Sequence, residues 1–184
     1  NYRRFFDING LAAIRMEEST VFAATHALVF KLIGEGRITG LRLDHTDGLY
    51  DPRAYFEQLQ RGAAGALGED WQDGQTRPFY VVAEKILERG EVLPQGWAID
   101  GTVGYDFLAS VSGLWVDPRA EAPFSAYYRR FTGNQTDYQE QIYHSKRQIM
   151  RSTLASEIIM LGRELEHIAD GNRRSRDFTS LILT

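Results

Sequence analysis

The sequence predicts an α/β fold, in which parallel strands alternate with helices, followed by a mainly helical region. Two short apolar runs, 40–43 and 79–83, each end in charged side chains, and a stretch with helical spacing, 51–60, lies between them. This order describes a βαβ unit, whose parallel strands end at the same edge of a sheet, the edge that carries the active site in β/α barrels. We therefore expect part of a catalytic (β/α)8 TIM barrel over residues 1–106 and a helical insertion subdomain over 107–184.

The first expected helix precedes the first strand. Ser19 or Thr20 can cap its start, because a hydroxyl oxygen accepts a hydrogen bond from a free N–H group there. Gly34 or Gly36 can end it, because glycine adopts the left-handed conformation common just after a helix. The helix should pack outside the sheet through apolar side chains that include Val21, Phe22, Leu28, Leu32 and Ile33.

The first expected strand leads into Asp44. Side chains alternate along a strand, so Leu41 and Leu43 share one face. Arg42 and Asp44 then share the other face, and two charges on a strand suited to burial are costly unless they serve each other or a ligand. Asp44 is therefore a candidate reacting group that Arg42 keeps ionised, and a purely structural ion pair is the alternative.

The second expected strand repeats this design and delivers Glu84. Asp51 and Pro52 should start the intervening helix, and the glycine-rich stretch 62–74 should contain its end and a loop. Desolvation at the end of an apolar strand would raise the pKa of Glu84 above its usual range. By strand alternation, Lys85 should point away from Glu84.

Two carboxylates that face one cleft suit glycoside chemistry. One attacks or stabilises the anomeric carbon while the other protonates the departing oxygen. Retaining enzymes hold the two groups roughly 5–5.5 Å apart, and inverting enzymes hold them farther apart. Asp44 and Glu84 are the expected pair.

Four ordered motifs, which cover most of the first 107 residues, resemble those of the maltooligosyltrehalose synthases, a family of the α-amylase superfamily. They are Asn1–Arg15, Leu41–Pro52, Val82–Leu87 and Gly101–Phe107. Each motif is short, and it is their common order along the chain that makes the resemblance specific.

The resemblance implies an intramolecular transglucosylation that converts the reducing-end α-1,4 linkage of a maltooligosaccharide into an α,α-1,1 linkage, a step of trehalose biosynthesis. It implies Asp44 as nucleophile, Glu84 as general acid/base and Arg42 as charge partner of Asp44. It also implies a third catalytic carboxylate beyond Thr184, no cofactor, and a separate trehalose-releasing hydrolase as a functional partner.

The motif departs from the wider amylase pattern after the nucleophile. A Lys-His pair is common three and four residues later, where this chain has Asp47 and Gly48. This departure favours a synthase, which must exclude water so that the freed glucose, turned in place, becomes the acceptor. Candidates for the polar wall of a closed acceptor pocket are His45, Asp47, Lys85, Tyr105 and Asp106, and Tyr50 or Trp97 could stack on a sugar face.

Length and helix-forming composition bear on how much of an enzyme is present. A β/α barrel takes about 250 residues, so a chain of 184 residues predicts a piece that is inactive alone. The run 135–170 is rich in good helix formers with apolar residues at helical spacing. Residues 180–184 are expected to begin a further element.

Composition argues against several classes of function. The chain is 43% hydrophobic, has a net charge of −4 and contains no cysteine, so nothing favours nucleic acid, membrane or thiolate chemistry. We expect a cytoplasmic protein. Asp44, Asp47 and Asp51 lack the alternating ligands and terminal Glu of a calcium-binding EF-hand loop, so no metal is expected. We expect structural or surface roles for the histidines on helical stretches, His26, His144 and His167.

Two other functions remain open from sequence. An amylase-like α-glucan hydrolase would use the same Asp44 and Glu84 and would release reducing sugar. A non-catalytic carbohydrate-binding or scaffold domain would tolerate loss of both carboxylates, an outcome that paired strand-end carboxylates disfavour.

Overall fold

The chain forms two compact units, residues 13–118 and residues 1–12 with 119–184, and each is described by itself. The computed structural model describes residues 4–5, 8–72, 74, 76–171 and 174. The element expected over 180–184 and part of the first motif fall outside these residues. The expected division into 1–106 and 107–184 stays a prediction.

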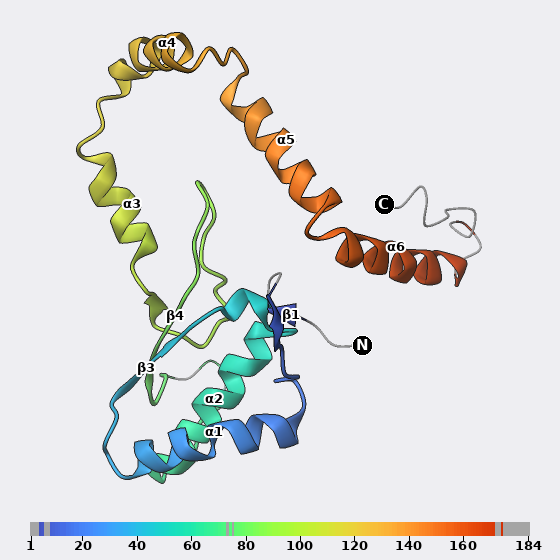
Figure 1. The fold of residues 1–184 in the computed structure, drawn as a ribbon. Helices are drawn as coiled ribbons and strands as arrows, with labels where there is room; N and C mark the ends of the chain where they lie inside the picture. The colour runs from blue at the N-terminus through green and yellow to red at the C-terminus, as the bar shows by residue number, and fades with distance from the viewer. Residues whose placement is uncertain (1–3, 6–7, 73, 75, 172–173, 175–184) are drawn as a thin grey trace. The chain divides into compact units, whose positions relative to one another are not determined.

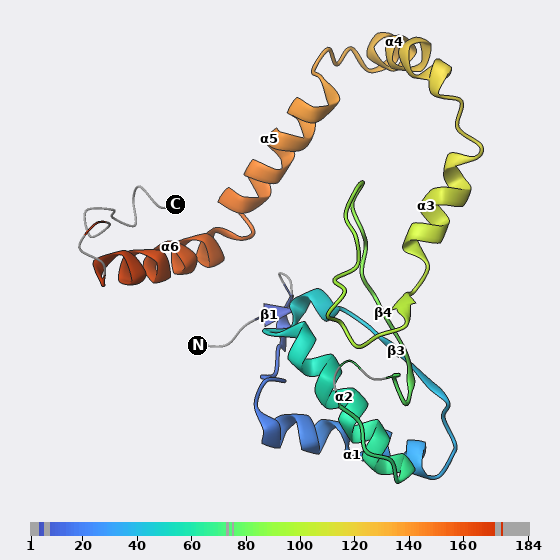
Figure 2. The same cartoon turned by 180° about the vertical axis from the view of Figure 1, so that it is seen from behind.

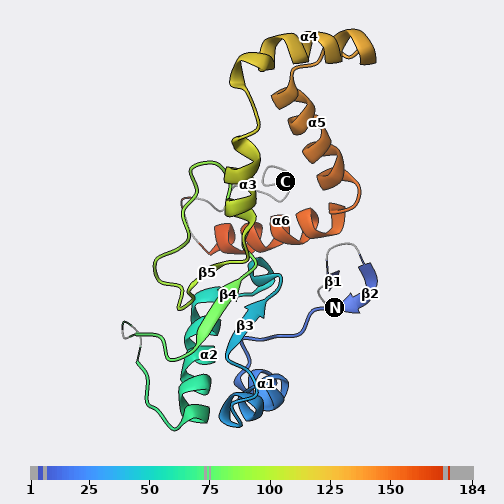
Figure 3. The same cartoon turned by 90° about the vertical axis from the view of Figure 1, so that its left-hand side faces the viewer.

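The larger unit is an α/β arrangement whose sheet has the strand order β3-β4-β5, all parallel (Figure 3). Its helices and strands, in chain order, are α1 (Ser19–Gly34), β3 (Gly40–Leu43), a turn of 3-10 helix (Thr46–Gly48), α2 (Pro52–Leu67), β4 (Tyr80–Ala83), β5 (Gly101–Thr102) and α3 (Tyr105–Gly113). The predicted βαβ unit of β3, α2 and β4 is therefore confirmed. Strand β5 was not predicted, because two residues are too few to show strand alternation.

The register of β3 against β4 brings the two expected carboxylates together. Leu43 is paired with Ala83, so Asp44 and Glu84 are the residues that follow a matched pair. The N–H of Glu84 continues the ladder and donates to the carbonyl oxygen of Leu43 at 2.7 Å. Parallel strands in this register deliver both side chains at one edge of the sheet.

Helices α1 and α2 pack together and contribute with the strands to one hydrophobic core (Figure 2). A Cβ atom added at Gly34 would lie 2.9 Å from the backbone oxygen of Ala66, so glycine permits the close approach of the two helices. The most buried large side chains of the core are Ile33, Phe56, Leu59 and Val81. Side chains of α1 and α2 therefore pack against the strands in this core.

One predicted helix start needs correction, and one predicted helix end is confirmed. The N-cap of α1 is Glu18, which makes no side-chain capping hydrogen bond in the described part of the chain, so neither Ser19 nor Thr20 caps the helix. Helix α2 runs through Gly62 and ends at Leu67, so its end lies in the stretch 62–74 that was predicted to contain it. Tertiary packing of α2 on α1 and the sheet outweighs the low helix propensity of glycine.

The predicted start of α2 is confirmed. The side chain of Asp51 accepts a hydrogen bond from the N–H of Ala54 at 2.9 Å, and Pro52 occupies the first turn, where a missing N–H costs nothing.

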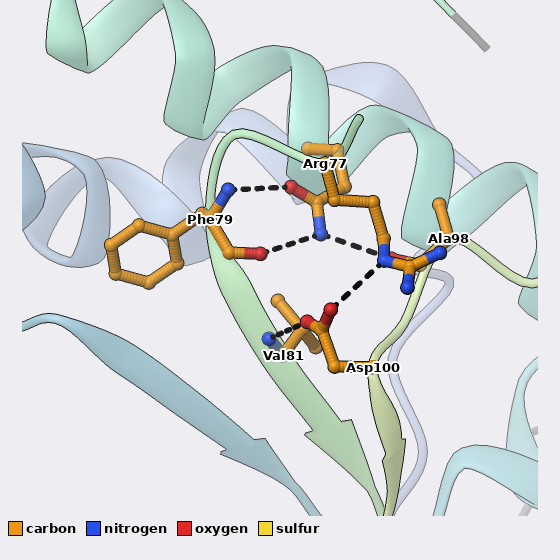
Figure 4. A network of polar contacts seen from close by, with 6 residues as sticks. Arg77, Phe79, Val81, Ala98 and Asp100 are labelled. Atoms are coloured by element: carbon orange, nitrogen blue, oxygen red, sulfur yellow. Dashed lines mark hydrogen bonds and ion pairs between the residues drawn. The ribbon is translucent and has the colours of Figure 1, made fainter. Parts of the chain in front are cut away.

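A buried polar network fixes the beginning of β4 (Figure 4). The Gln60 side-chain amide donates to the carbonyl oxygens of Phe79 and Ala98 at 2.9 and 3.0 Å, and its oxygen accepts from the N–H of Phe79 at 3.2 Å. The Asp100 carboxylate accepts from the N–H of Val81 at 2.7 Å and pairs with Arg77 at 3.0 Å. This network ties β4 to α2 and to the segment that enters β5.

His26 has a structural role, as expected. Its ring stacks on Phe22 with centroids 4.0 Å apart, and its Nε2 atom lies 2.9 Å from the Tyr55 hydroxyl. Burial raises the pKa of Tyr55 to about 12. The pair lies between α1 and α2, within the described core.

The described residues of the smaller unit form a two-stranded antiparallel sheet and three α-helices (Figures 1 and 3). Its elements are β1 (Arg4–Phe5), β2 (Ile8–Ala12), α4 (Glu121–Thr132), α5 (Tyr138–Arg151) and α6 (Ala155–Asp170). The helical run expected over 135–170 is two helices, because the backbone of Ser152 leaves the helical region. Of the described helices, none is long and apolar enough to cross a membrane.

Candidate active site

Asp44 and Arg42 form the ion pair that strand alternation predicted. The Nη2 atom of Arg42 lies 3.5 Å from Oδ1 of Asp44, and both side chains are more than half exposed. An exposed pair at this distance adds little stability. The pair lies at the end of β3, where it is better placed to bind a ligand than to stabilise the fold.

Glu84 is bonded by groups from two other segments. Its Oε2 atom accepts from the N–H of His45 at 2.9 Å, and its Oε1 atom accepts from the Tyr105 hydroxyl at 3.1 Å. Its backbone oxygen accepts from the hydroxyl of Thr46, which is buried, at 2.9 Å. The loop that follows Asp44 and the start of α3 therefore both close on Glu84.

The pKa of Glu84 is lowered, contrary to the expectation that desolvation would raise it. The largest cause is the hydrogen bond from the N–H of His45, and the second is that from the Tyr105 hydroxyl. Desolvation opposes them, and Asp44 and Arg42 add smaller lowering effects. Donors that bond the charged form outweigh partial burial. The sequence could not show this, because the donor N–H is a backbone group.

The turn after Asp44 has an unusual backbone at His45. Its φ of +50° lies in the left-handed region, which non-glycine residues seldom adopt. A Cβ atom added at Gly48 would lie 2.6 Å from both Cδ2 and Nε2 of the His45 ring. Glycine at position 48 therefore leaves room for the imidazole of His45, which explains why the motif has glycine there.

Tyr105 and Asp106 begin α3. The N-cap of this helix is Gly104, with φ of +103°, a conformation that glycine adopts readily. The hydroxyl of Thr102 donates to Asp106, and this bond is the largest cause that lowers the pKa of Asp106. Tyr105 thus faces Glu84 while Asp106 is bonded to the end of β5.

Lys85 lies between two carboxylates. Its Nζ atom is 3.0 Å from Glu91 Oε1 and 3.4 Å from Asp47 Oδ2, and its side chain is only 15% exposed. The hydrogen bond to Glu91 is the main cause that raises the pKa of Lys85. As alternation predicted, Lys85 makes these contacts away from the Glu84 carboxylate, yet it reaches the same turn through Asp47.

A cavity of about 210 Å³ adjoins the two strand ends and is lined by Arg42, Val103, Gly104, Tyr105 and Leu108. A second, of about 170 Å³, lies beside Leu49, Tyr50 and the start of α2. Tyr50 is 82% exposed and open to a ligand. Trp97 is partly buried and packs on Phe56 with ring centroids 5.1 Å apart, which gives it a structural role.

Of the residues expected at the site, Arg42 lies in β3, and Asp44, His45 and Asp47 follow that strand. Glu84 and Lys85 directly follow β4, and Tyr105 and Asp106 begin α3 shortly after β5. Thr46, Thr102 and Glu91 were missed. Thr46 lies within the motif of Asp44, and its small hydroxyl carries no pattern of its own. Glu91 had no sequence signal, since an exposed-looking Glu in a loop is ordinary. Among the described side chains, no group of three potential metal ligands occurs.

Comparison with known proteins gives a consistent result. The chain is 39% identical over 165 residues to a Mycobacterium tuberculosis protein provisionally named maltooligosyl trehalose synthase, a match that covers 88% of this chain and 20% of the relative. It also superposes on the structure of maltooligosyltrehalose synthase from Arthrobacter ramosus with a TM-score of 0.80 and 38% identity. The chain is similar to part of a maltooligosyltrehalose synthase.

The similarity extends along nearly all of this chain but only part of its relatives. The Arthrobacter ramosus match covers 92% of this chain and 21% of that one. A Sulfolobus tokodaii protein described as a hypothetical maltooligosyl trehalose synthase matches with a TM-score of 0.72 and 30% identity, over 89% of this chain and 20% of that one. The chain thus spans about a fifth of the length of the maltooligosyltrehalose synthases that it matches. No protein-family model matches it.

Proposed function

We propose that this chain supplies the nucleophile and the general acid/base of a maltooligosyltrehalose synthase, within part of a TIM barrel of the α-amylase type. The observation that carries the proposal is the junction of two strand-end carboxylates, in which the residue after Asp44 bonds the side chain of Glu84. The likeness to named synthases over most of the chain supports the same reaction. The substrate is a maltooligosaccharide, and the product would pass to a trehalose-releasing hydrolase in the cytoplasm.

The proposed reaction has two displacements at one anomeric carbon. The Asp44 carboxylate attacks C1 of the penultimate glucose, the bond from C1 to the glycosidic oxygen breaks, and Glu84 gives that oxygen its proton. The freed glucose turns in place, Glu84 takes the proton from its C1 hydroxyl, and that oxygen displaces Asp44. Two inversions leave an α,α-1,1 linkage. The third carboxylate of the superfamily would come from outside this chain.

Glu84 must be protonated for the first step, so its environment must change when substrate binds. Tyr105 and the N–H of His45 stabilise the carboxylate in the free protein. A sugar that excludes water and takes the Tyr105 hydroxyl as a partner would raise the pKa of Glu84 toward that of a general acid. In the second step the same donors favour the carboxylate that serves as base.

The test uses a full-length synthase that contains this chain, incubated with maltopentaose while reducing ends and total sugar are followed. We expect reducing ends to fall without chain shortening, and Asp44→Asn to abolish the change. Asp70→Asn, in the exposed loop after α2, is the matched control and should behave as wild type. New reducing ends would indicate an amylase-like hydrolase, and no change in any protein would indicate a binding or scaffold domain.

A further inference from the structure

Lys85 bridges the turn after the proposed nucleophile and the loop after β4. Its side chain is only 15% exposed, and its ammonium group lies between Asp47 and Glu91. The second carboxylate oxygen of Glu91 accepts from the N–H of Glu88 at 2.9 Å, which closes the loop on itself. Glu91 is therefore fixed by a backbone group and in turn fixes Lys85.

This bridge runs beside the contacts that Glu84 makes with the same turn. His45 and Thr46 form hydrogen bonds with Glu84, and Asp47 pairs with Lys85, which directly follows Glu84 in the chain. Three successive residues of one segment thus meet two successive residues of the other. Of the three, Asp47 is the one whose side chain is mostly exposed, at 58%, so its carboxylate can accept hydrogen bonds from a sugar.

The fate of the glycosyl-enzyme depends on which acceptor reaches it. If the retained glucose attacks, the bond to Asp44 breaks, Glu84 takes the proton of the sugar hydroxyl, and the 1,1-linked product forms. If water attacks, the same bond breaks, Glu84 takes a proton of water, and a shortened chain and free glucose leave. Retention of glucose at a fixed position favours the first outcome.

We propose that Glu91 is a positioning residue that, through Lys85, holds the Asp47 carboxylate toward the acceptor glucose and so sets the ratio of transglycosylation to hydrolysis. The inference rests on the proposed synthase function. An Asp on an exposed turn has several rotamers, and an ammonium group that is itself anchored by Glu91 selects one of them. Without Glu91, Lys85 is free to turn toward solvent, and Asp47 loses its fixed partner.

The experiment compares Glu91→Gln with Glu88→Gln in a full-length synthase that contains this chain. Glu88 is in the same loop and contributes a backbone N–H to the network, so loss of its carboxylate leaves the bridge intact. With maltopentaose as substrate, free glucose and non-reducing product are measured at equal substrate consumption. We expect Glu91→Gln to raise the share of free glucose roughly five-fold, the scale set by one hydrogen bond, and Glu88→Gln to leave it unchanged.

A second readout uses isotopically labelled glucose in the medium. Wild type should exclude the label, because its own glucose does not leave, whereas Glu91→Gln should incorporate label in the terminal 1,1-linked glucose of the product. A change in folding alone would lower both products together and would not admit label. Glu91→Asp, which keeps the charge on a shorter side chain, should give an intermediate share of free glucose.

Each outcome decides the inference. An unchanged product ratio without labelled product in Glu91→Gln overturns it, and so does an equal rise in the Glu88→Gln control. If the wild-type enzyme forms no 1,1-linked product, the proposed function itself fails and the inference fails with it. If Glu91→Gln is too unstable to assay, the ratio measured in Glu91→Asp decides, and a wild-type ratio there counts against the proposal.

Discussion

The ionisation of Glu84 is set by hydrogen bonds at the level of single residues. A backbone N–H and a phenol hydroxyl each bond one carboxylate oxygen, and together they outweigh desolvation. The Tyr105 hydroxyl responds in the opposite sense, since its bond to Glu84 is the largest cause that raises the pKa of Tyr105. One contact therefore stabilises the charged form of one group and the neutral form of the other.

Replacement of Tyr105 by Phe tests this contact. The variant loses the second-largest cause of the lowered pKa of Glu84, so that pKa should rise. A general acid is lost as pH rises through its pKa, so the basic limb of kcat/KM in a full-length synthase should move to higher pH. The measurement is a pH–rate profile with maltopentaose.

Tyr80→Phe is the control, because the exposed Tyr80 side chain lies on β4 without a described bond to Glu84. A basic limb that stays in place in Tyr105→Phe, or that moves equally in Tyr80→Phe, would show that Tyr105 does not tune Glu84.

The packing of α2 against α1 makes one glycine of α2, Gly62, more important for stability than another, Gly65. A Cβ atom added at Gly62 would lie 2.2 Å from the ring of Phe30 in α1, whereas one added at Gly65 would meet no described atom within 4 Å. The two positions are one turn apart on the same helix, so intrinsic helix propensity is the same at both.

Two alanine substitutions separate packing from propensity. Gly62→Ala should destabilise the chain by about 1–3 kcal/mol, because the Phe30 ring or helix α1 must shift to make room for the added methyl group. Gly65→Ala should stabilise it by about 0.5–1 kcal/mol, the usual gain for alanine over glycine inside a helix. Urea unfolding followed by circular dichroism measures both, and equal effects at the two positions would contradict this account of the α1–α2 contact.

Gln60 connects α2 to the start of β4 by hydrogen bonds, and its replacement should lower the free energy of unfolding. Gln60→Leu would leave three buried backbone groups of Phe79 and Ala98 without their partner. Each unsatisfied buried group costs about 1–3 kcal/mol, so we expect at least about 2 kcal/mol of destabilisation. Gln58→Leu, a half-buried position on the same helix, is the control in the same unfolding experiment, and similar losses in both variants would refute a special role for Gln60.

At the scale of the whole molecule, much apolar surface has no described partner. None of the described residues of α3 is buried, and Trp115 just after it is 85% exposed. The chain also spans about a fifth of the relatives that it matches. Exposed apolar patches of this kind mark surfaces that pack against other protein.

We therefore expect the 184-residue chain alone to bind a hydrophobic fluorescent dye strongly and to show no synthase activity. Trp115→Ser should weaken dye binding measurably, because it removes one of the largest exposed apolar side chains, while Arg89→Ser, in an exposed loop, should not. Dye fluorescence at equal protein concentration is the measurement. Weak dye binding by the unmodified chain would contradict this reading of its surface.

The sequence by itself determined the parallel βαβ unit, the Asp51 cap and the Arg42–Asp44 pair, because these depend on local alternation, spacing and capping chemistry. It also determined the resemblance to synthases, because the motifs lie in order along the chain. It placed the end of α2 correctly within 62–74 and was wrong about the residue that caps the start of α1.

Only the tertiary structure decided the ionisation of Glu84, the strand β5 and the bridge from Glu91 through Lys85 to Asp47. The physical reason is the same in each case. A backbone N–H, a two-residue strand and a loop carboxylate have no sequence pattern of their own, and each becomes a specific partner only when the fold brings a distant segment within hydrogen-bond distance.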